Sequence, residues 1–347
     1  MTKKLNKQNT LRDPAKKQAE VTEEMWQQVN QDYREKVEEF VSVQDLSPAS
    51  RKQYISVLRQ FGWYMQSSMN NKPFFKITKR DFLRYLSYIR DNRKMSSSAI
   101  GVRKSVVSSF CNHIENIIAE EEPEYKTFRN FTRGLPAIAK NRTYEKVKVT
   151  KDEFDLMMNV LEEDENWLGM AWLATAFLVG ARRSEIIQFK TEILNYEIPD
   201  DMDFVMSHTV RGKGKSLDGK PLQYMVPLIV LPFWKKWVDS RGYESDYIFT
   251  TKYSNEIKVM STAWADEFCS NTLSDILERR INVHIFKNSC ITNLLESGVD
   301  IKLVSKFVAH HNDISTTQIY DLRDFEDEKK KIFSTKKKDN SEDNSES

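Results

Sequence analysis

The stretch from residue 167 to residue 186 reads WLGMAWLATAFLVGARRSEI and joins the longest apolar run of the chain to two consecutive arginines. Its apolar part, residues 167–181, is shorter than the roughly 18–20 residues that span a bilayer, so we expect a buried helix. An unpaired charge is costly inside a protein, and Arg182 and Arg183 therefore need partners or a ligand. Glu185 could neutralise one of them, so the motif alone is compatible with a structural ion pair or a functional site.

Basic and acidic residues are distributed unevenly along the chain, although their totals nearly balance. The 347 residues include 53 Lys and Arg against 51 Asp and Glu. Residues 1–150 hold 28 basic and 17 acidic side chains, whereas residues 151–347 hold 25 basic and 34 acidic ones. Residues 51–150 alone carry 20 basic and 8 acidic side chains. This split predicts two regions with different roles, and the basic region favours nucleic acid as a partner.

Composition narrows the class of protein further. The length favours about two domains, and a hydrophobic fraction of 39% with 7 Trp and 19 Phe argues against global disorder. Only 10 Gly and 9 Pro favour long helices over an all-β fold. The N-terminus MTKKLNKQNT has no apolar stretch after its lysines and predicts no signal peptide, and no membrane partner is expected. An odd number of cysteines without a CxxC pair fits a reducing cytoplasm, and these residues are Cys111, Cys269 and Cys290.

Helical periodicity dominates the first half of the chain. Residues 22–43 have apolar positions near 3.6 spacing and predict one helix. Ser47-Pro48, the Thr78/Asp81 pair and the serine run 96–98 predict the starts of three further helices. We therefore expect a polar N-terminal segment over residues 1–40, a helical domain over residues 41–135 and a linker over residues 136–149.

The second half mixes helices with a short β region. Thr150 and Glu153 predict a capping box that opens a domain over residues 150–333. Helical patterns follow, and they cover residues 154–161 and 167–189.

The β-like segments of this second domain are residues 204–206 and 224–228, with a turn within residues 212–219. The rest of the domain is predicted to be mostly helical, and the low-complexity tail at residues 334–347 is predicted to be disordered. The expected fold class is mainly α with a small β-sheet or hairpin: a helical domain followed by a mixed α/β domain.

Two more clusters in the second domain carry polar residues at helical spacing. His284 and Lys287 share a helix face and could grip one anion, although such a pair is typical of a solvated surface. Residues 311–320 form the other cluster and end in Tyr320. His310 and His311 predict no metal site, because adjacent helical residues point in different directions and no further ligand lies at a suitable spacing.

Taken in order, these clusters resemble the tyrosine recombinase (phage integrase) family. That family has an Arg in a Gly-x-Arg-x-Ser-Glu stretch, a Lys in a β-hairpin, a His-x-x-Arg pair, a further His and a Tyr nine residues later. Residues 294–300 and 314–320 also look like the family, and the helical part beginning at residue 46 resembles its core-binding domain. The resemblance covers roughly residues 40–325. The matching catalytic positions are Arg182, Lys213, His284, Lys287, His311 and Tyr320.

The resemblance implies an enzyme that cuts and rejoins DNA through a covalent 3′-phosphotyrosine on Tyr320, with no cofactor. Arg182 and Lys287 would bind the non-bridging phosphate oxygens, where charge develops. His284 and His311 would donate hydrogen bonds or shuttle protons.

Two lysines of the predicted turn are candidates for the general acid. Lys213 is favoured by its place in the hairpin, and Lys215 is the alternative. Glu185 is expected to orient Arg182.

The same resemblance implies double-stranded DNA as the partner, clamped by both domains, and a homo-tetramer on paired sites. Cations of the basic first domain would contact phosphates and position the duplex. The expected DNA-binding residues are Arg51, Lys52, Arg59, Lys79, Arg80, Arg84, Arg103 and Lys104.

Two positions depart from the family pattern. Lys287 replaces the second family arginine, and lysine lacks the planar fork that matches a phosphate. His310 replaces the usual Gly before the last His, so the nine-residue spacing to Tyr320 is what favours His311. Two alternatives therefore stay open: a DNA-binding protein of this fold that has lost catalysis, and a type IB topoisomerase-like relaxing enzyme.

Overall fold

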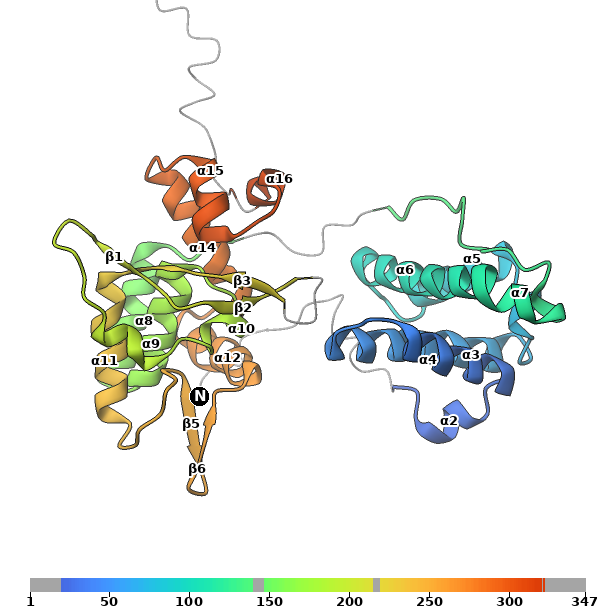
Figure 1. Ribbon diagram of the computed structural model, residues 1–347, viewed down its shortest axis with the longest axis horizontal. Coiled ribbons are helices and arrows are strands. Elements are labelled where there is room, and N and C mark those ends of the chain that lie inside the picture. Colours follow the sequence, from blue (N-terminus) through green and yellow to red (C-terminus); the bar gives the residue numbers. More distant parts are fainter. Residues whose placement is uncertain (1–19, 140–146, 215–218, 320, 322–347) are drawn as a thin grey trace, which may run out of the picture. The chain divides into compact units, whose positions relative to one another are not determined.

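The computed structural model describes residues 20–139, 147–214, 219–319 and 321. The chain divides into two compact units, residues 1–145 and 146–347 (Figure 1).

Helices build the described part of the first unit. Three of the caps predicted from the sequence are confirmed: Ser47 accepts a hydrogen bond from Ser50 N, Thr78 and Asp81 form a reciprocal capping box, and Ser96 starts the next helix. The main helices are α2 (Glu23–Gln27), α3 (Gln31–Val43), α4 (Pro48–Ser68), α5 (Lys79–Asp91) and α6 (Ser97–His113). Shorter turns are η1 (Phe74–Lys76), η2 (Ile114–Ile118), α7 (Ala119–Glu121) and η3 (Pro123–Tyr125).

The single helix predicted over residues 22–43 is wrong, because the chain breaks before Gln31. The Asn30 side chain accepts a hydrogen bond from the backbone N of Tyr33 at 3.2 Å and so caps α3. Thr22 caps the short α2 in the same manner. An asparagine at a break satisfies donors that would otherwise stay unpaired at the new helix end.

Aromatic rings fill the core of the first unit. The ring of Tyr33 lies 5.3 Å from Phe74 and 5.6 Å from Phe110, centroid to centroid. Its hydroxyl donates to the Leu58 carbonyl at 2.9 Å, which satisfies the polar atom inside the core. The expected domain start at residue 41 is therefore too late, because five earlier residues are buried in this core: Trp26, Val29, Tyr33, Val37 and Phe40.

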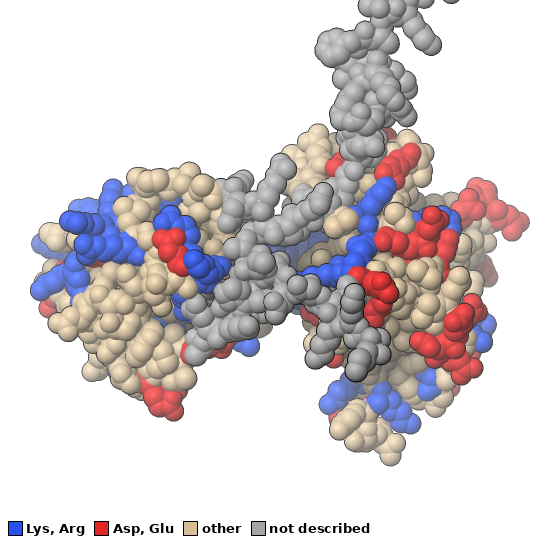
Figure 2. Space-filling model, turned by 180° about the vertical axis from the view of Figure 1, so that it is seen from behind, with Lys and Arg blue, Asp and Glu red and all other residues tan. Residues whose placement is uncertain are grey.

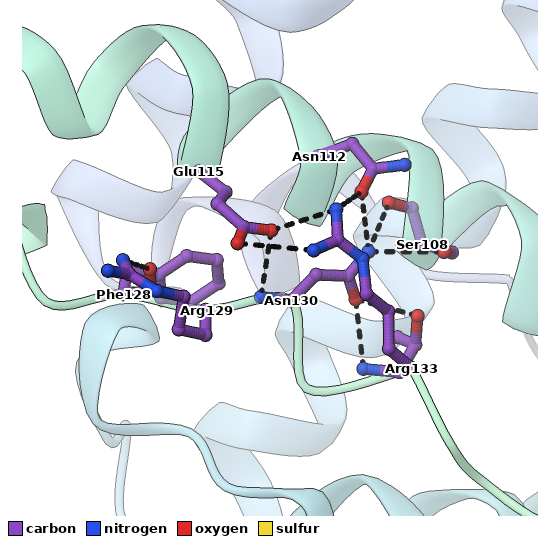
Figure 3. A network of polar contacts seen from close by, with 8 residues as sticks. Ser108, Asn112, Glu115, Phe128, Arg129, Asn130 and Arg133 are labelled. Atoms are coloured by element: carbon purple, nitrogen blue, oxygen red, sulfur yellow. Dashed lines mark hydrogen bonds and ion pairs between the residues drawn. The ribbon is translucent and has the colours of Figure 1, made fainter.

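A polar network pins residues 128–133 against α6 and η2 (Figure 3). The side chain of Asn130 donates to Ser108 O at 3.2 Å and to Asn112 Oδ1 at 2.8 Å. Glu115 accepts from Asn130 N at 3.2 Å and pairs with Arg133 at 3.0 Å. This network fixes the segment by which the chain leaves the helices of the first unit.

The second unit is also mainly helical, and its predicted capping box at Thr150 and Glu153 is confirmed. None of the helices within the described ranges combines the length and the hydropathy that crossing a bilayer requires. The longer helices are α8 (Lys151–Glu163), α9 (Trp167–Ala174), α11 (Leu231–Ser240), α12 (Thr262–Phe268) and α14 (Val283–Glu296). Shorter ones are η4 (Thr175–Val179), α10 (Arg183–Ile186), η5 (Thr191–Asn195), η6 (Leu228–Val230), η7 (Cys269–Leu273), α13 (Ser274–Ile276), α15 (Ile301–Leu303), η8 (Val304–Ala309) and α16 (Ile314–Gln318).

Trp172 and Trp234 lie at the centre of this second core, and both are fully buried. Trp172 on α9 makes an edge contact with Phe286 on α14, at 5.8 Å between ring centroids. Trp234 on α11 donates its indole N–H to Thr175 Oγ1 at 2.6 Å, so its polar atom is satisfied. The predicted apolar run is thus a buried helix against which α11 and α14 pack.

Three antiparallel strand pairs complete the described part of the second unit. The β-like segments predicted at residues 204–206 and 224–228 are confirmed, because β1 (Phe204–Met206) pairs with β4 (Met225–Pro227). A second pair between them, β2 (Val210–Gly212) with β3 (Lys220–Leu222), was not predicted as strands. A third pair, β5 (Thr250–Tyr253) and β6 (Glu256–Val259), was not predicted from the sequence. Its tight turn consists of Ser254 and Asn255, both at positive φ. Asparagine favours such a turn, so Asn255 is the sequence feature that could have predicted this hairpin.

The helix predicted over residues 167–189 stops at Gly180, whose φ is +68°. A Cβ at this position would lie 2.9 Å from Cys290 Sγ on α14, so the site also demands the small residue for space. The left-handed turn ends η4 and releases the chain into an extended segment before α10. The break therefore decides where the arginines of the motif lie.

We expect Gly180→Ala to lower the free energy of unfolding by about 2–4 kcal/mol, because it adds a left-handed strain of about 1 kcal/mol to a steric clash. Urea denaturation of the full chain measures this change. Gly298→Ala is the matched control, since Gly298 has φ +86° and no heavy atom near an added Cβ. Equal losses for the two variants would show that the contact with Cys290 does not constrain Gly180.

Candidate active site

Arg182 lies in the extended segment that follows Gly180, with about a quarter of its side chain exposed. Its Nη1 pairs with Glu185 Oε1 at 3.0 Å, and its backbone N donates to Glu185 Oε2 at 2.8 Å. Arg183 turns elsewhere and pairs with Asp266 on α12. The two adjacent arginines thus have different partners, and Glu185 holds Arg182 while leaving part of its guanidinium open to a ligand.

Glu185 is fully buried and remains the anionic centre of this region. Burial opposes its ionisation, but a hydrogen bond from the Tyr224 hydroxyl and the charge of Arg182 outweigh it and lower the pKa of Glu185. The charge of Lys287 acts in the same direction. A carboxylate with this set of donors can fix a cation in place.

Lys287 is buried on α14, with 5% of its surface exposed, whereas His284 one turn earlier is exposed. The Lys287 ammonium donates to the Ala309 carbonyl at 3.1 Å. Burial and then the charge of Arg182 lower the pKa of Lys287 to about 8. His284 and Lys287 are therefore in different surroundings, although they lie one turn apart on the same helix. The hydrogen bond from Lys287 connects α14 to Ala309 at the end of η8.

His310 and His311 follow η8 directly. His310 has a φ of 52°, the left-handed region that favours glycine, at the place where the resemblance leads one to expect Gly. Its ring makes an edge contact with Tyr224 at 4.6 Å between centroids. His311 Nδ1 lies 2.9 Å from Thr317 Oγ1 on α16.

Both histidines are neutral at pH 7. Burial and the charge of Lys287 lower the pKa of His310 to about 4 and that of His311 to about 4. The charge of Arg182 also acts on each of them. Both rings are therefore close enough to Arg182 and Lys287 to be influenced by their charges.

The β2–β3 hairpin carries Lys213 and Lys220, and Lys220 acts electrostatically on both histidines. Lys213 directly follows β2 and is exposed. The glycine after it is required by close packing, because a Cβ on Gly214 would lie 2.6 Å from the backbone N of Lys220. Lys220 was not predicted as a site residue, yet its ammonium donates to Asn312 Oδ1 at 2.8 Å and its charge acts on His311. Lys215 lies outside the described residues.

Tyr320 also lies outside the described residues, and α16 ends shortly before it. The hydrogen bond between His311 and Thr317 nevertheless ties the helix that precedes Tyr320 to this region. Within the described ranges, no group of His, Cys, Asp or Glu side chains could hold a metal ion.

The cations proposed to bind DNA differ in their surroundings. Lys and Arg gather on the face of the first unit seen in Figure 2, whereas both charge signs intersperse on the second. Arg59 pairs with Glu23 at 2.9 Å, and Arg103 donates to Gln60 Oε1 at 3.0 Å, so both are engaged between helices. Of the remainder, Arg51 and Lys104 are half-buried, and the exposed ones are Lys52, Lys79, Arg80 and Arg84.

The sequence of this second unit decides the family. Residues 148–326, more than half of the chain, match the phage integrase family, and residues 33–119 match the phage integrase N-terminal SAM-like domain. The chain belongs to the phage integrase family. All six expected catalytic positions fall within the first match, and all eight expected DNA-binding positions fall within the second.

Named relatives agree with this membership. The chain is 57% identical to the SPbeta prophage-derived recombinase-like protein YomM of Bacillus subtilis (strain 168), over 96% of this chain and 100% of that protein. Its fold is similar to that of the XerH site-specific recombinase in a post-cleavage complex with a palindromic difH substrate, with 15% identity, a TM-score of 0.63 and coverage of 81% and 79%. It is also similar to a lambda integrase tetramer bound to a Holliday junction, with 13% identity, a TM-score of 0.60 and coverage of 85% and 79%.

The buried Lys287 of this integrase-family chain predicts a pH-dependent stability. Its pKa is about 8 in the folded chain against an ordinary value of 10.5, so burying the cation opposes folding most strongly below pH 8. That opposition disappears as the pH rises from 8 to 10.5. Wild type should therefore gain stability relative to Lys287→Met over this range, on the order of 3 kcal/mol.

Urea denaturation of both proteins between pH 7 and pH 10 measures the difference. Lys302→Met, at an exposed position on α15, is the control and should show a flat difference. A pH-independent difference for Lys287→Met would mean that Lys287 titrates as a solvated lysine.

Proposed function

We propose that this chain is a site-specific DNA recombinase that cuts and rejoins double-stranded DNA through a covalent phosphotyrosine. The observation that carries the proposal is the partly exposed Arg182, held by an ionised Glu185 and backed by Lys287. These groups supply a fixed positive potential for one phosphate in a chain of the phage integrase family.

In the proposed cleavage step, the phenolic oxygen of Tyr320 attacks phosphorus while the bond from phosphorus to the 5′-oxygen breaks. Arg182 donates to the non-bridging oxygens, where negative charge grows in the transition state. Lys287 is proposed to contribute its charge through space, because its ammonium is buried and donates to the Ala309 carbonyl. The product is a 3′-phosphotyrosine and a free 5′-hydroxyl.

Proton transfer needs a base and an acid. A neutral His311 can accept the phenolic proton or donate a hydrogen bond, and His284 is proposed to assist from the first turn of α14. Lys213 is proposed to protonate the leaving 5′-oxygen, with Lys215 as the alternative. The phosphotyrosine conserves the energy of the phosphodiester, so rejoining by a 5′-hydroxyl reverses the same steps and we expect no cofactor.

The partner that this chemistry requires is duplex DNA. XerH has been solved with its difH substrate, and lambda integrase as a tetramer on a Holliday junction. We propose that this chain likewise forms a homo-tetramer on paired sites. We propose a cytoplasmic location, where DNA is accessible and the three buried, unpaired cysteines stay reduced.

One observation favours a second candidate, a DNA-binding protein of this fold without cleavage. Lys287 has no guanidinium fork and is held by the Ala309 carbonyl, so one phosphate contact of the family pattern is weakened. Cleavage by wild type would exclude this candidate. Cleavage that appears only in Lys287→Arg would support it, whereas site-independent relaxation of supercoiled plasmid would indicate the topoisomerase-like alternative.

We expect the wild-type chain to form a denaturant-resistant adduct with a nicked duplex that carries its attachment site, taken from the DNA that flanks its gene. Tyr320→Phe removes the nucleophilic oxygen and should abolish the adduct on a denaturing gel. Tyr253→Phe, at a residue that is 84% exposed on β5, should leave it intact. An adduct formed by Tyr320→Phe would show that another residue attacks the phosphate.

DNA affinity should fall with salt in proportion to the phosphates contacted. Lys79 and Arg80 are exposed in the first turn of α5, so we expect Lys79→Ala and Arg80→Ala each to reduce the slope of log K against log salt by about 1. Lys235→Ala, at a lysine paired with Asp239 on α11, is the control and should leave the slope unchanged.

Arg103→Ala provides the contrast within the first unit. Because Arg103 bonds Gln60 and the Ala99 carbonyl, we expect lower stability and an unchanged salt slope for this variant. Fluorescence anisotropy at several salt concentrations measures the slopes. Unchanged slopes for both Lys79→Ala and Arg80→Ala would remove α5 from the proposed DNA surface.

A further inference from the structure

Tyr224 is a buried residue between β3 and β4 that the family resemblance did not single out. Its ring makes edge contacts with Phe189, at 5.9 Å between centroids, and with His310, at 4.6 Å. Its hydroxyl donates a hydrogen bond to Glu185 Oε2. The residue therefore connects the strand region, the segment after η8 and the carboxylate that holds Arg182.

Each oxygen of Glu185 has a defined donor. Oε1 accepts from Arg182 Nη1 at 3.0 Å, and Oε2 accepts from the backbone N of Arg182 at 2.8 Å and from Tyr224. Since Glu185 is fully buried, losing one donor leaves the carboxylate without a replacement from bulk water. The hydrogen bond from Tyr224 is thus part of what keeps the carboxylate ionised and in place.

We propose that Tyr224 is a positioning residue for strand cleavage, which holds Arg182 toward the scissile phosphate by way of Glu185. This inference rests on the proposed recombinase function. Tyr224 itself touches neither the phosphate nor the nucleophile in this scheme. Its effect reaches the reaction because Arg182 can present a fixed guanidinium only while Glu185 stays charged.

The charges around Glu185 make the positioning role of Tyr224 depend on pH. The titratable groups that face the carboxylate are Arg182 before α10, Tyr224 after β3, Lys287 on α14 and His310 after η8. Burial raises the pKa of Glu185, while Tyr224, Arg182 and Lys287 lower it. Removing the Tyr224 hydroxyl deletes one lowering effect, so the pKa of Glu185 must rise and the carboxylate must protonate at a higher pH.

Single-turnover cleavage of the nicked duplex tests the proposal across pH 4 to pH 8. We expect Tyr224→Phe to cleave about tenfold more slowly than wild type at the acid end of this range, with a deficit that shrinks as the pH rises. Tyr243→Phe is the matched control: its hydroxyl lies 3.2 Å from Thr250 Oγ1, and its rate profile should follow wild type. A Tyr224→Phe profile parallel to that of wild type would overturn the proposal.

A double-mutant cycle separates positioning from general damage to the core. Glu185→Gln removes the charge on which Tyr224 acts, so adding Tyr224→Phe to it should cost little further rate. Losses that multiply in the double variant would mean that Tyr224 acts independently of Glu185, and the proposal would be wrong.

A stability measurement keeps this inference separate from the proposed function. Glu185 has a lowered pKa in the folded wild type, so its contribution is present at neutral pH and is lost as the pH falls. The stability gap between wild type and Tyr224→Phe should therefore be larger at pH 7 than at pH 4, and the same gap measured in a Glu185→Gln background should not change. Absence of wild-type cleavage would count against the recombinase function, whereas a pH-independent gap would overturn the coupling of Tyr224 to Glu185.

Discussion

The carboxylate of Glu185, ionised although fully buried, is the interaction on which the rest of the site depends. It remains charged because Tyr224 and Arg182 donate to it and Lys287 adds a nearby positive charge. A buried carboxylate without these groups would be costly. The groups come from the start of α10, the β3–β4 connection and α14, so one anion fixes the relation of three segments that are distant in sequence.

The same arrangement concentrates positive charge at one place in an almost neutral chain. Around Glu185 lie two cations, Arg182 and Lys287, while His310 and His311 are neutral at pH 7. The local charge is therefore positive even though the second unit as a whole is acidic. Lysine in place of the second family arginine keeps this charge but directs it toward the Ala309 carbonyl, so the proposed function gives the direct phosphate contact to Arg182.

Local signals predicted the helix starts well, because a cap such as that at Ser47 or Thr150 joins atoms only three residues apart. The periodicity failed at Asn30 and Gly180, where a new cap and the contact with Cys290 override it. The ordered motifs identified Arg182, Lys287 and His311 as candidates. Tyr224 and Lys220 were missed because their contacts, with Glu185 and Asn312, are made across long sequence separations that no spacing reveals.

The role of Glu185 in holding Arg182 for the scissile phosphate is open to a direct test. A crystal structure of the Tyr320→Phe chain on a duplex carrying its attachment site provides it. We expect Arg182 to donate to a non-bridging oxygen of that phosphate while still paired with Glu185, and Lys287 to stay on the Ala309 carbonyl. A scissile phosphate bound away from Arg182, or an Arg182 that has left Glu185 to reach it, would contradict this role.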